Sequence, residues 1–233
     1  DPLPFPAGPN GWQLSFSHIK QDAAAAGTST GNLTVGPVCI TIGSINLSGV
    51  PGYTGCNRHT QDGGVTYPRV ITGDFSITTN TSRVVITGPP CVLYVQGGGS
   101  FVGNGSSVET TDECRNATII FSGKIALSQS AQFKGGPADE GRMYVYDDFG
   151  DPYDSNNNNR VIDLANTVSG GLFFAPLGEV QISNSAQIVA VTGAKITFQN
   201  FAHIIYEEGA ANFYSPNPTS GYLPLFSEFH EIE

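Results

Sequence analysis

The sequence predicts an all-β protein built as a parallel β-solenoid, with an irregular N-terminal arm before it and a C-terminal capping strand after it. Three observations favour this class. Gly (29) and Pro (15) are abundant, whereas charged residues make up only 13% of the 233 residues, a composition that excludes coiled coils and helical bundles. From about Val35 onward, short alternating apolar runs are separated by Gly, Asn, Ser and Thr, which is typical of many short strands. Finally, one ten-residue phrase recurs along the chain.

Residues 1–34 precede the repeats and differ from them in pattern. They are rich in Pro and Ala, contain the single Trp of the chain, Trp12, and show no clear period. We therefore expect an irregular arm or cap over residues 1–34 and a solenoid domain over residues 35–233, with an acidic insertion around residues 146–163. No run approaches the roughly 18 apolar residues that a membrane helix needs, so we expect no membrane span in this chain.

The recurring phrase can be aligned in five windows. They are DFSITTNTSR from Asp74, GSFVGNGSSV from Gly99, KIALSQSAQF from Lys124, EVQISNSAQI from Glu179 and KITFQNFAHI from Lys195. The second and fourth positions are expected to face inward, including Ser100 and Val102, and the tenth position is apolar except at Arg83. The window starts differ by 25, 25, 55 and 16 residues. The step of 55 therefore predicts an insertion together with one or two degenerate coils.

The sixth position of the windows predicts a corner between two strands. It holds an amide at Asn104, Gln129, Asn184 and Asn200, and a hydroxyl in the first window. Strict alternation would point this side chain inward, so we expect a bend at which the amide bonds backbone groups and stacks on its copy in the next coil. An antiparallel sandwich is the alternative, although it gives no reason for such a phrase to repeat.

Four cysteines, Cys39, Cys56, Cys91 and Cys114, lack the C-x-x-C spacing and the neighbouring His pairs of a zinc site. They predict two disulfides. Three pairings are possible, and we favour Cys39 with Cys56 and Cys91 with Cys114, because each closes a short loop. Disulfides persist in oxidising compartments, so the cysteines predict an exported, extracellular protein.

The charge balance argues against a nucleic-acid partner. Ten basic residues stand against twenty acidic ones, which gives a formal charge of -10. A groove for nucleic acid is built on clustered Lys and Arg. We therefore expect no binding to nucleic acid.

The acidic insertion is the candidate metal site. Its possible calcium ligands are Asp147, Asp148, Asp151, Asp154 and Asn156. Asp154 and Asn156 take the first and third places of an EF-type loop, but Arg160 falls at the seventh place and Ala165 at the twelfth, where a Glu belongs. Calcium in this loop and a solvated acidic loop without metal both stay open, and no other cofactor is expected.

An enzyme is the second possibility that a solenoid raises. Polysaccharide-cleaving proteins need carboxylates gathered near a Lys, an Arg or a second acid. The sequence-adjacent acidic pairs are Asp112 with Glu113, Asp139 with Glu140, and Glu207 with Glu208. Neighbours on a strand point to opposite faces, so we expect these pairs to be surface charge and the protein to have no catalytic activity. A secreted protein that binds or cleaves polysaccharides is kept as the alternative function.

The chain from about Ile71 to Glu233 resembles a known family, and the most specific matches lie in its last third. The phrases KIALSQSAQF, GGLFFAPLGEVQISNSAQI and VAVTGAKITFQNFAHIIYEE are similar to the C-terminal solenoid domain of PilX-type and related type IV pilus assembly proteins. Phe173 to Pro176 match an "iYAP" element of that family and Ile205 to Glu208 match an "ihYDe" element. The tail from Ser227 to Glu233 is similar to the family's "sWrEl" ending, with Phe229 in place of Trp.

The resemblance implies a right-handed solenoid, which also agrees with the general hand of parallel crossovers. It implies a structural or adhesive subunit of a pilus-like filament outside the cell, without chemistry of its own. Its partners would be other pilin-like subunits and possible surface glycans. The family normally carries a hydrophobic N-terminal helix that this sequence does not show, so we expect that helix to be missing from the headpiece or supplied by a separate chain.

Overall fold

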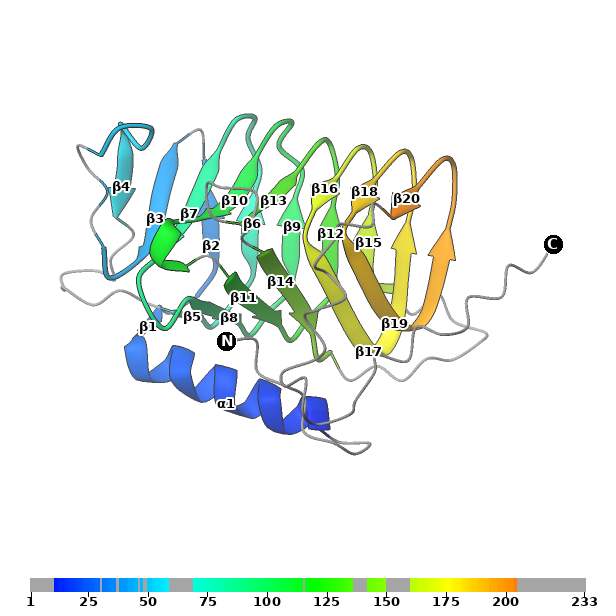
Figure 1. Ribbon diagram of the computed structural model, residues 1–233, viewed down its shortest axis with the longest axis horizontal. Helices are drawn as coiled ribbons and strands as arrows, with labels where there is room; N and C mark the ends of the chain where they lie inside the picture. The colour runs from blue at the N-terminus through cyan, green and yellow to red at the C-terminus, as the bar shows by residue number, and fades with distance from the viewer. Residues whose placement is uncertain are drawn as a thin grey trace, which may run out of the picture.

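The computed structural model describes residues 11–204, except for residues 30, 37, 46, 48, 49, 59–68, 115, 136–141 and 150–159. Figure 1 shows a stack of parallel strands with a single α-helix, α1 (Gly11–Ala26), lying along one side. Every strand pair in the described part of the chain is parallel, and successive partners lie one coil apart in the sequence. The predicted parallel β-solenoid is therefore confirmed.

Each coil contributes strands to three faces. The first face contains β1 (Thr28–Ser29), β5 (Val70–Ile71), β8 (Val92–Val95), β11 (Asn116–Phe121), β14 (Arg142–Asp147) and the beginnings of β17 (Leu172–Ile182) and β19 (Ala190–Phe198). The second face contains β2 (Leu33–Val35), β6 (Phe75–Ile77), β9 (Gly99–Phe101), β12 (Ile125–Leu127), β15 (Arg160–Leu164) and the ends of β17 and β19. Because β17 runs around the corner between them, these two faces form one 12-stranded sheet.

The third face is a separate 8-stranded sheet. Its strands are β4 (Cys56–Arg58), β3 (Cys39–Gly43), β7 (Arg83–Thr87), β10 (Ser107–Thr110), β13 (Gln132–Lys134), β16 (Ser169–Gly170), β18 (Gln187–Ile188) and β20 (His203–Ile204). A short 3-10 helix, η1 (Asp112–Cys114), follows β10.

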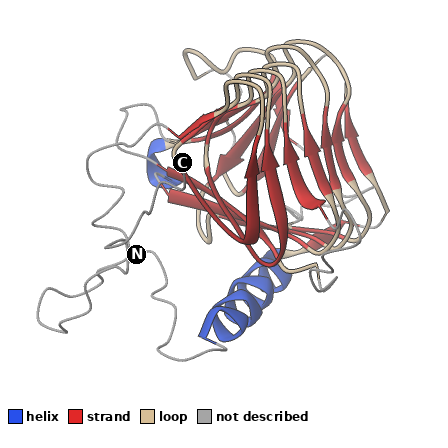
Figure 2. Cartoon of the chain, turned by 90° about the vertical axis from the view of Figure 1, so that its right-hand side faces the viewer, coloured by secondary structure: helices blue, strands red, loops and turns tan. Residues whose placement is uncertain are grey.

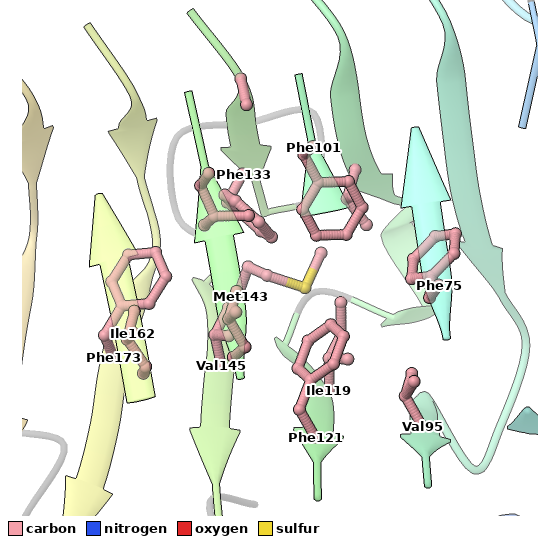
Figure 3. Packing of buried hydrophobic residues seen from close by; sticks show 14 of the residues in the cluster. Phe75, Val95, Phe101, Ile119, Phe121, Phe133, Met143, Val145, Ile162 and Phe173 are labelled. Carbon is pink, nitrogen blue, oxygen red and sulfur yellow. The ribbon is translucent and has the colours of Figure 1, made fainter. Parts of the chain in front are cut away.

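The solenoid interior is filled by a column of phenylalanine rings that crosses the coils (Figure 3). The ring of Phe101 meets the rings of Phe75 and Phe133 edge to face, with centroids 5.1 and 5.8 Å apart. Phe133 meets Phe173 in the same way at 5.7 Å. Edge-to-face contacts are the favoured geometry for aromatic pairs, so this column joins neighbouring coils through side chains as well as through backbone hydrogen bonds.

The spacing of the coils agrees with part of the repeat analysis. The long step between the third and fourth windows contains one additional coil, formed by β15 and β16. Ile162 of this coil is in register with Ile125 below it and Val180 above it. The expectation of one or two degenerate coils in this step is therefore confirmed with one coil, whereas most of the acidic insertion lies outside the described residues.

Two inward positions in the windows were predicted wrongly. Phe75 and Ile77 pair with Gly99 and Phe101, so Phe101 is buried while Val102 is exposed. The inward assignment of Ser100 and Val102 is thus shifted by one residue, because the corner after Phe101 is one residue longer than the corner after Leu127.

The same longer corner explains Arg83. It pairs with Ser107 on the outer side of the third face, while the next residue, Val84, pairs with Val108 in the core. Arg83 therefore does not interrupt the inward column.

The expected irregular arm over residues 1–34 is wrong for most of its described part. Residues 11–26 form α1, and β1 and β2 already belong to the first coil, so the solenoid begins before residue 35. Phe16, Ile19 and Ala23 are buried at helical spacing. Phe16 stacks on Tyr146 with ring centroids 4.9 Å apart, which places α1 against the first face (Figure 2).

The capping strand expected at the C-terminus falls within residues 205–233, which lie outside the described residues. Across the described residues, no helix combines the length and apolar character that crossing a bilayer requires.

Candidate functional site

The two disulfides join Cys39 to Cys56 and Cys91 to Cys114, so the favoured pairing is confirmed. Cys39 and Cys56 are also register partners on β3 and β4. The first bridge therefore fixes β4 as an added strand at the edge of the third face. Two bridges fit a secreted, β-rich protein, because disulfides persist in oxidising compartments.

Asp147, one of the predicted calcium ligands, points into the solenoid. It follows Met143 and Val145 on the inward side of β14 and is 1% exposed. One carboxyl oxygen, Oδ1, accepts a hydrogen bond from the backbone N–H of Phe149 at 2.7 Å, and the other, Oδ2, is buried without a partner. Burial raises the pKa of Asp147 to about 8, so this carboxyl is protonated at neutral pH.

Asp148 lies on the outer side, where it joins α1 to the first face. Its carboxylate pairs with Lys20 of α1 and accepts a hydrogen bond from Ser122 Oγ at 2.6 Å. Lys20 also lies over the ring of Tyr94, 4.8 Å from its centroid. Asp148 therefore has a structural role in holding the helix.

The structure thus uses the two described candidate calcium ligands, Asp147 and Asp148, separately. Asp151, Asp154 and Asn156 lie outside the described residues. In the described part, no three His, Cys, Asp or Glu side chains gather closely enough to hold a metal ion. Calcium binding by the insertion stays a prediction.

The predicted corner amides lie at the bends between the second and third faces. Gln129, Asn184 and Asn200 adopt left-handed backbone conformations, with φ of 56°, 53° and 50°, a region that Asn tolerates better than most residues. The side-chain amide of Asn200 donates to Asn184 Oδ1 at 3.0 Å. In the longer corner, Gly105 takes the positive φ instead of Asn104.

These corner residues also bond to each other through their backbones. The N–H of Ser185 donates to Asn200 O at 3.1 Å, and the N–H of Thr167 donates to Asn184 O at the same distance. Asn166 occupies the equivalent corner of the additional coil, with φ 54°. The amide row is therefore part of the turn architecture of the solenoid.

The sequence-adjacent acidic pairs do not form a site in the described residues. Asp112 and Glu113 lie in η1, and the other two pairs lie outside the described residues. The structure instead assembles a different polar cluster on the outer side of the second face. It consists of Arg160, Asp163, Glu179, Gln181, Lys195 and Thr197, and we call it the polar ladder.

Two parallel rows make up the polar ladder. Arg160, Glu179 and Lys195 are register partners in one row. Asp163, Gln181 and Thr197 are register partners in the other row. Neighbouring strands lie about 4.8 Å apart, so the side chains of each row are in reach of each other.

Glu179 is the anchor of the polar ladder. It is 3% exposed. Its Oε1 accepts a hydrogen bond from Thr197 Oγ1 at 2.6 Å and forms an ion pair with Lys195 Nζ at 3.3 Å. A buried carboxylate with two such partners is held in one orientation. The two rows are therefore connected through Glu179.

Three buried atoms of the polar ladder have no hydrogen-bond partner. They are Arg160 Nε, Asp163 Oδ1 and Gln181 Oε1. The guanidinium of Arg160 approaches Asp163 Oδ2 at 4.0 Å, which leaves Oδ1 unpaired. Buried polar groups are almost always hydrogen-bonded in native proteins, so this cluster is the strongest candidate binding site among the described residues.

Sequence reasoning missed the polar ladder because its residues are far apart along the chain. Asp163 belongs to the additional coil, which the windows did not include. A signal was nevertheless present: Glu179 and Lys195 open the last two windows, and Gln181 and Thr197 take their third positions. Reading the outward columns of aligned windows would have placed four of the six residues together.

The last described coil has a second unusual feature. Ile196, Phe198 and Ile204 occupy inward positions but are 38%, 48% and 39% exposed. Their partners one coil earlier are Val180, Ile182 and Ile188, all fully buried. We call these three exposed residues the terminal apolar patch; β19 and β20, which carry them, lie at the right-hand end of the stack in Figure 1.

Comparisons with known proteins give no relative: no family model, no curated protein and no solved structure matches this sequence.

Proposed function

We propose that this protein is an extracellular structural subunit of a pilus-like filament, and that it associates with its partner subunit through the terminal apolar patch. The observation that carries the proposal is the exposure of Ile196, Phe198 and Ile204. The same positions in the preceding coil are core residues. A solenoid coil buries its apolar side only by stacking on neighbouring coils. The last described coil has the apolar residues of an interior coil, but among the described residues only one coil stacks on it.

The backbone of the last described coil also favours association at this end of the stack. Within the described residues, β19 pairs only with β17, so it is an edge strand of nine residues. Exposed edge strands present unpaired N–H and C=O groups and bind added strands readily. An apolar row together with an open edge favours an end-on contact with another chain.

The location and the partner follow from different features. Two disulfides support export, and the resemblance of the chain from about Ile71 to Glu233 supports a pilus-like assembly with pilin-like subunits or a separate hydrophobic helix chain. Glycans on the opposing surface would be the adhesive target. This proposal assigns the chain no catalytic step.

Assembly can be tested by light scattering after size-exclusion chromatography, over a range of protein concentrations. We expect the wild-type chain to associate, Phe198→Asp to stay monomeric, and the control Val102→Asp to behave like wild type. Val102 is also exposed but lies in a corner far from the end. A wild-type chain that is monomeric at every soluble concentration, or that associates only when residues 205–233 are deleted, contradicts end-on assembly.

The filament itself is tested on native material. Electron microscopy with an antibody against this chain, combined with mass spectrometry of the isolated assembly, is expected to show labelled filaments and a co-purifying hydrophobic helix. A freely secreted monomer without such a partner contradicts the filament assignment.

A further inference from the structure

We propose that the polar ladder is a binding site for a neutral oligosaccharide chain. The inference rests on the second face alone and is independent of the end-on contact. Its central residue is Gln181, which is 6% exposed, lies between Asp163 and Thr197 in register, and has a buried Oε1 without a partner. Leaving a buried acceptor unpaired destabilises the folded protein, and a bound donor would offset this cost.

The unpaired atoms define the chemistry of the ligand. Asp163 Oδ1 and Gln181 Oε1 are acceptors, whereas Arg160 Nε is a donor. A ligand that satisfies all three must both donate and accept hydrogen bonds. Hydroxyl groups do both, and a sugar presents several of them on one face.

The charges of the polar ladder argue against ionic ligands. Asp163 and Glu179 are balanced by Arg160 and Lys195, and all four groups already take part in ion pairs: Lys195 lies 3.3 Å from Glu179 and Arg160 lies 4.0 Å from Asp163. A metal cation would meet two basic side chains and would leave Arg160 Nε unpaired. An anion would meet two carboxylates. A neutral polyhydroxylated ligand avoids both conflicts.

The surface next to the polar ladder suits an extended ligand. The outward row of Asp163 continues through Ala126, Ser100, Ser76 and Thr34, each in register with the next. Small and hydroxyl-bearing side chains at a repeat of about 4.8 Å give a flat track along the second face. A chain of sugars can lie along this track with its most strongly bound unit over Gln181.

The test uses the full chain and an array of oligosaccharides that includes glucans, mannans, chitin fragments and uronans, followed by calorimetry with the best binder. We expect a neutral oligosaccharide to bind, and Gln181→Met and Asp163→Asn each to weaken it about tenfold or more, the effect of losing one well-formed buried hydrogen bond. The matched control is Gln187→Met, an exposed Gln on the third face, which is expected to bind like wild type.

Folding is checked by thermal unfolding with and without the same oligosaccharide. The sugar is expected to raise the Tm of wild type and of Gln187→Met, because ligands that bind only the native state stabilise it, but not the Tm of Gln181→Met. The proposal is overturned if only uronans bind, if no oligosaccharide binds, or if Gln181→Met and Gln187→Met bind alike. A Tm increase with CaCl2 alone that disappears in Asp163→Asn would make the polar ladder a cation site instead.

Discussion

The two ends of the solenoid differ in how well the inward residues of their last coil are covered. In the first coil, the inward residues Leu33, Val35 and Ile42 are buried. In the last described coil, the inward residues of the terminal apolar patch are exposed. Both coils have only one neighbouring coil in the described part of the chain, so stacking alone does not account for the difference.

The N-terminal end is stabilised by residues that do not belong to the repeat. β4 extends the third face one strand beyond the first coil and is held there by the Cys39–Cys56 disulfide. Leu47 and Cys56 pack on Val85 of β7 in a small separate cluster. The segment between β3 and β5 thus adds a covalently fixed strand and its own apolar contacts.

Arg69 is a buried side chain that also stabilises the N-terminal end. Arg69 is 1% exposed, and its guanidinium donates to the backbone carbonyls of Ile42 at 3.2 Å, Gly88 at 2.5 Å and Thr87. Burial lowers the pKa of Arg69 to about 10, so the side chain stays charged at neutral pH. It joins the ends of β3 and β7 where the chain leaves the third face.

A repeat therefore determines the interior of this solenoid, whereas its ends depend on added elements. The N-terminal end has three of them: the β4 strand, its disulfide and Arg69. The described part of the C-terminal end has the sequence of an ordinary coil. Four measurements test this difference between the two ends.

The largest effect is expected for Arg69→Met. The change leaves three buried carbonyl groups without their donor, and each such group costs about 1–3 kcal/mol, so we expect a loss of about 3–5 kcal/mol in the free energy of unfolding. Arg83→Met is the control, because Arg83 is partly exposed and pairs with Glu109 at 2.7 Å on the surface, where ion pairs contribute about 1 kcal/mol or less. Equal losses in urea denaturation would show that Arg69 has no special role.

Removal of the first disulfide is expected to cost slightly less. Cys39 and Cys56 are 17 residues apart, and closing a loop of that size stabilises a protein by about 3 kcal/mol. In the double variant Cys39→Ala/Cys56→Ala, hydrogen exchange should accelerate in β3 and β4 but not in β17 and β19. Uniform acceleration through all coils would mean that the N-terminal end is not a separate stabilising unit.

A coil between the ends supplies the third measurement. Asp147 has a pKa near 8 in the folded protein against an ordinary value of 3.8. Between these pH values the folded chain therefore binds one more proton than the unfolded chain, and stability falls as pH rises. We expect Asp147→Asn to remove this decline and to be more stable than wild type at pH 8, since burial penalises the charged carboxyl.

Urea denaturation at several pH values measures that effect in both proteins. Wild type and Asp147→Asn are expected to be similar in stability at low pH and to diverge as the pH increases. Parallel pH profiles would show that the carboxyl of Asp147 is not buried in solution.

The fold could be predicted because stacking repeats an inward pattern. Phe75, Ile125 and Val180 occupy one column in the sequence and one column in the structure. The registers near Ser100 and Arg83 could not be predicted with windows of fixed length, because corners of different length change the register without changing the composition. The helix was missed because its buried residues, Phe16, Ile19 and Ala23, lie among Ala and polar residues and give no clear period.

The candidate site was predictable only in part. The acidic insertion attracted attention because its charges are close in sequence, yet Asp147 and Asp148 point to opposite sides of β14. The polar ladder depends on residues that become neighbours only after coiling, such as Asp163 and Gln181. The outward columns of the repeat would therefore have been a better guide to this cluster than local charge density.

The smallest effect is expected at the C-terminal end itself, for Phe198→Ala. Phe198 and Ile182 are register partners on neighbouring strands, but only Ile182 is fully buried. Truncating a buried Ile costs about 2–5 kcal/mol, whereas a half-exposed ring that lacks packing on one side should cost less than about 1 kcal/mol. Urea denaturation of dilute Ile182→Ala and Phe198→Ala measures both values. If Phe198→Ala costs as much as Ile182→Ala in the dilute monomer, the last coil is covered in solution, and the two ends differ in what covers them rather than in whether they are covered.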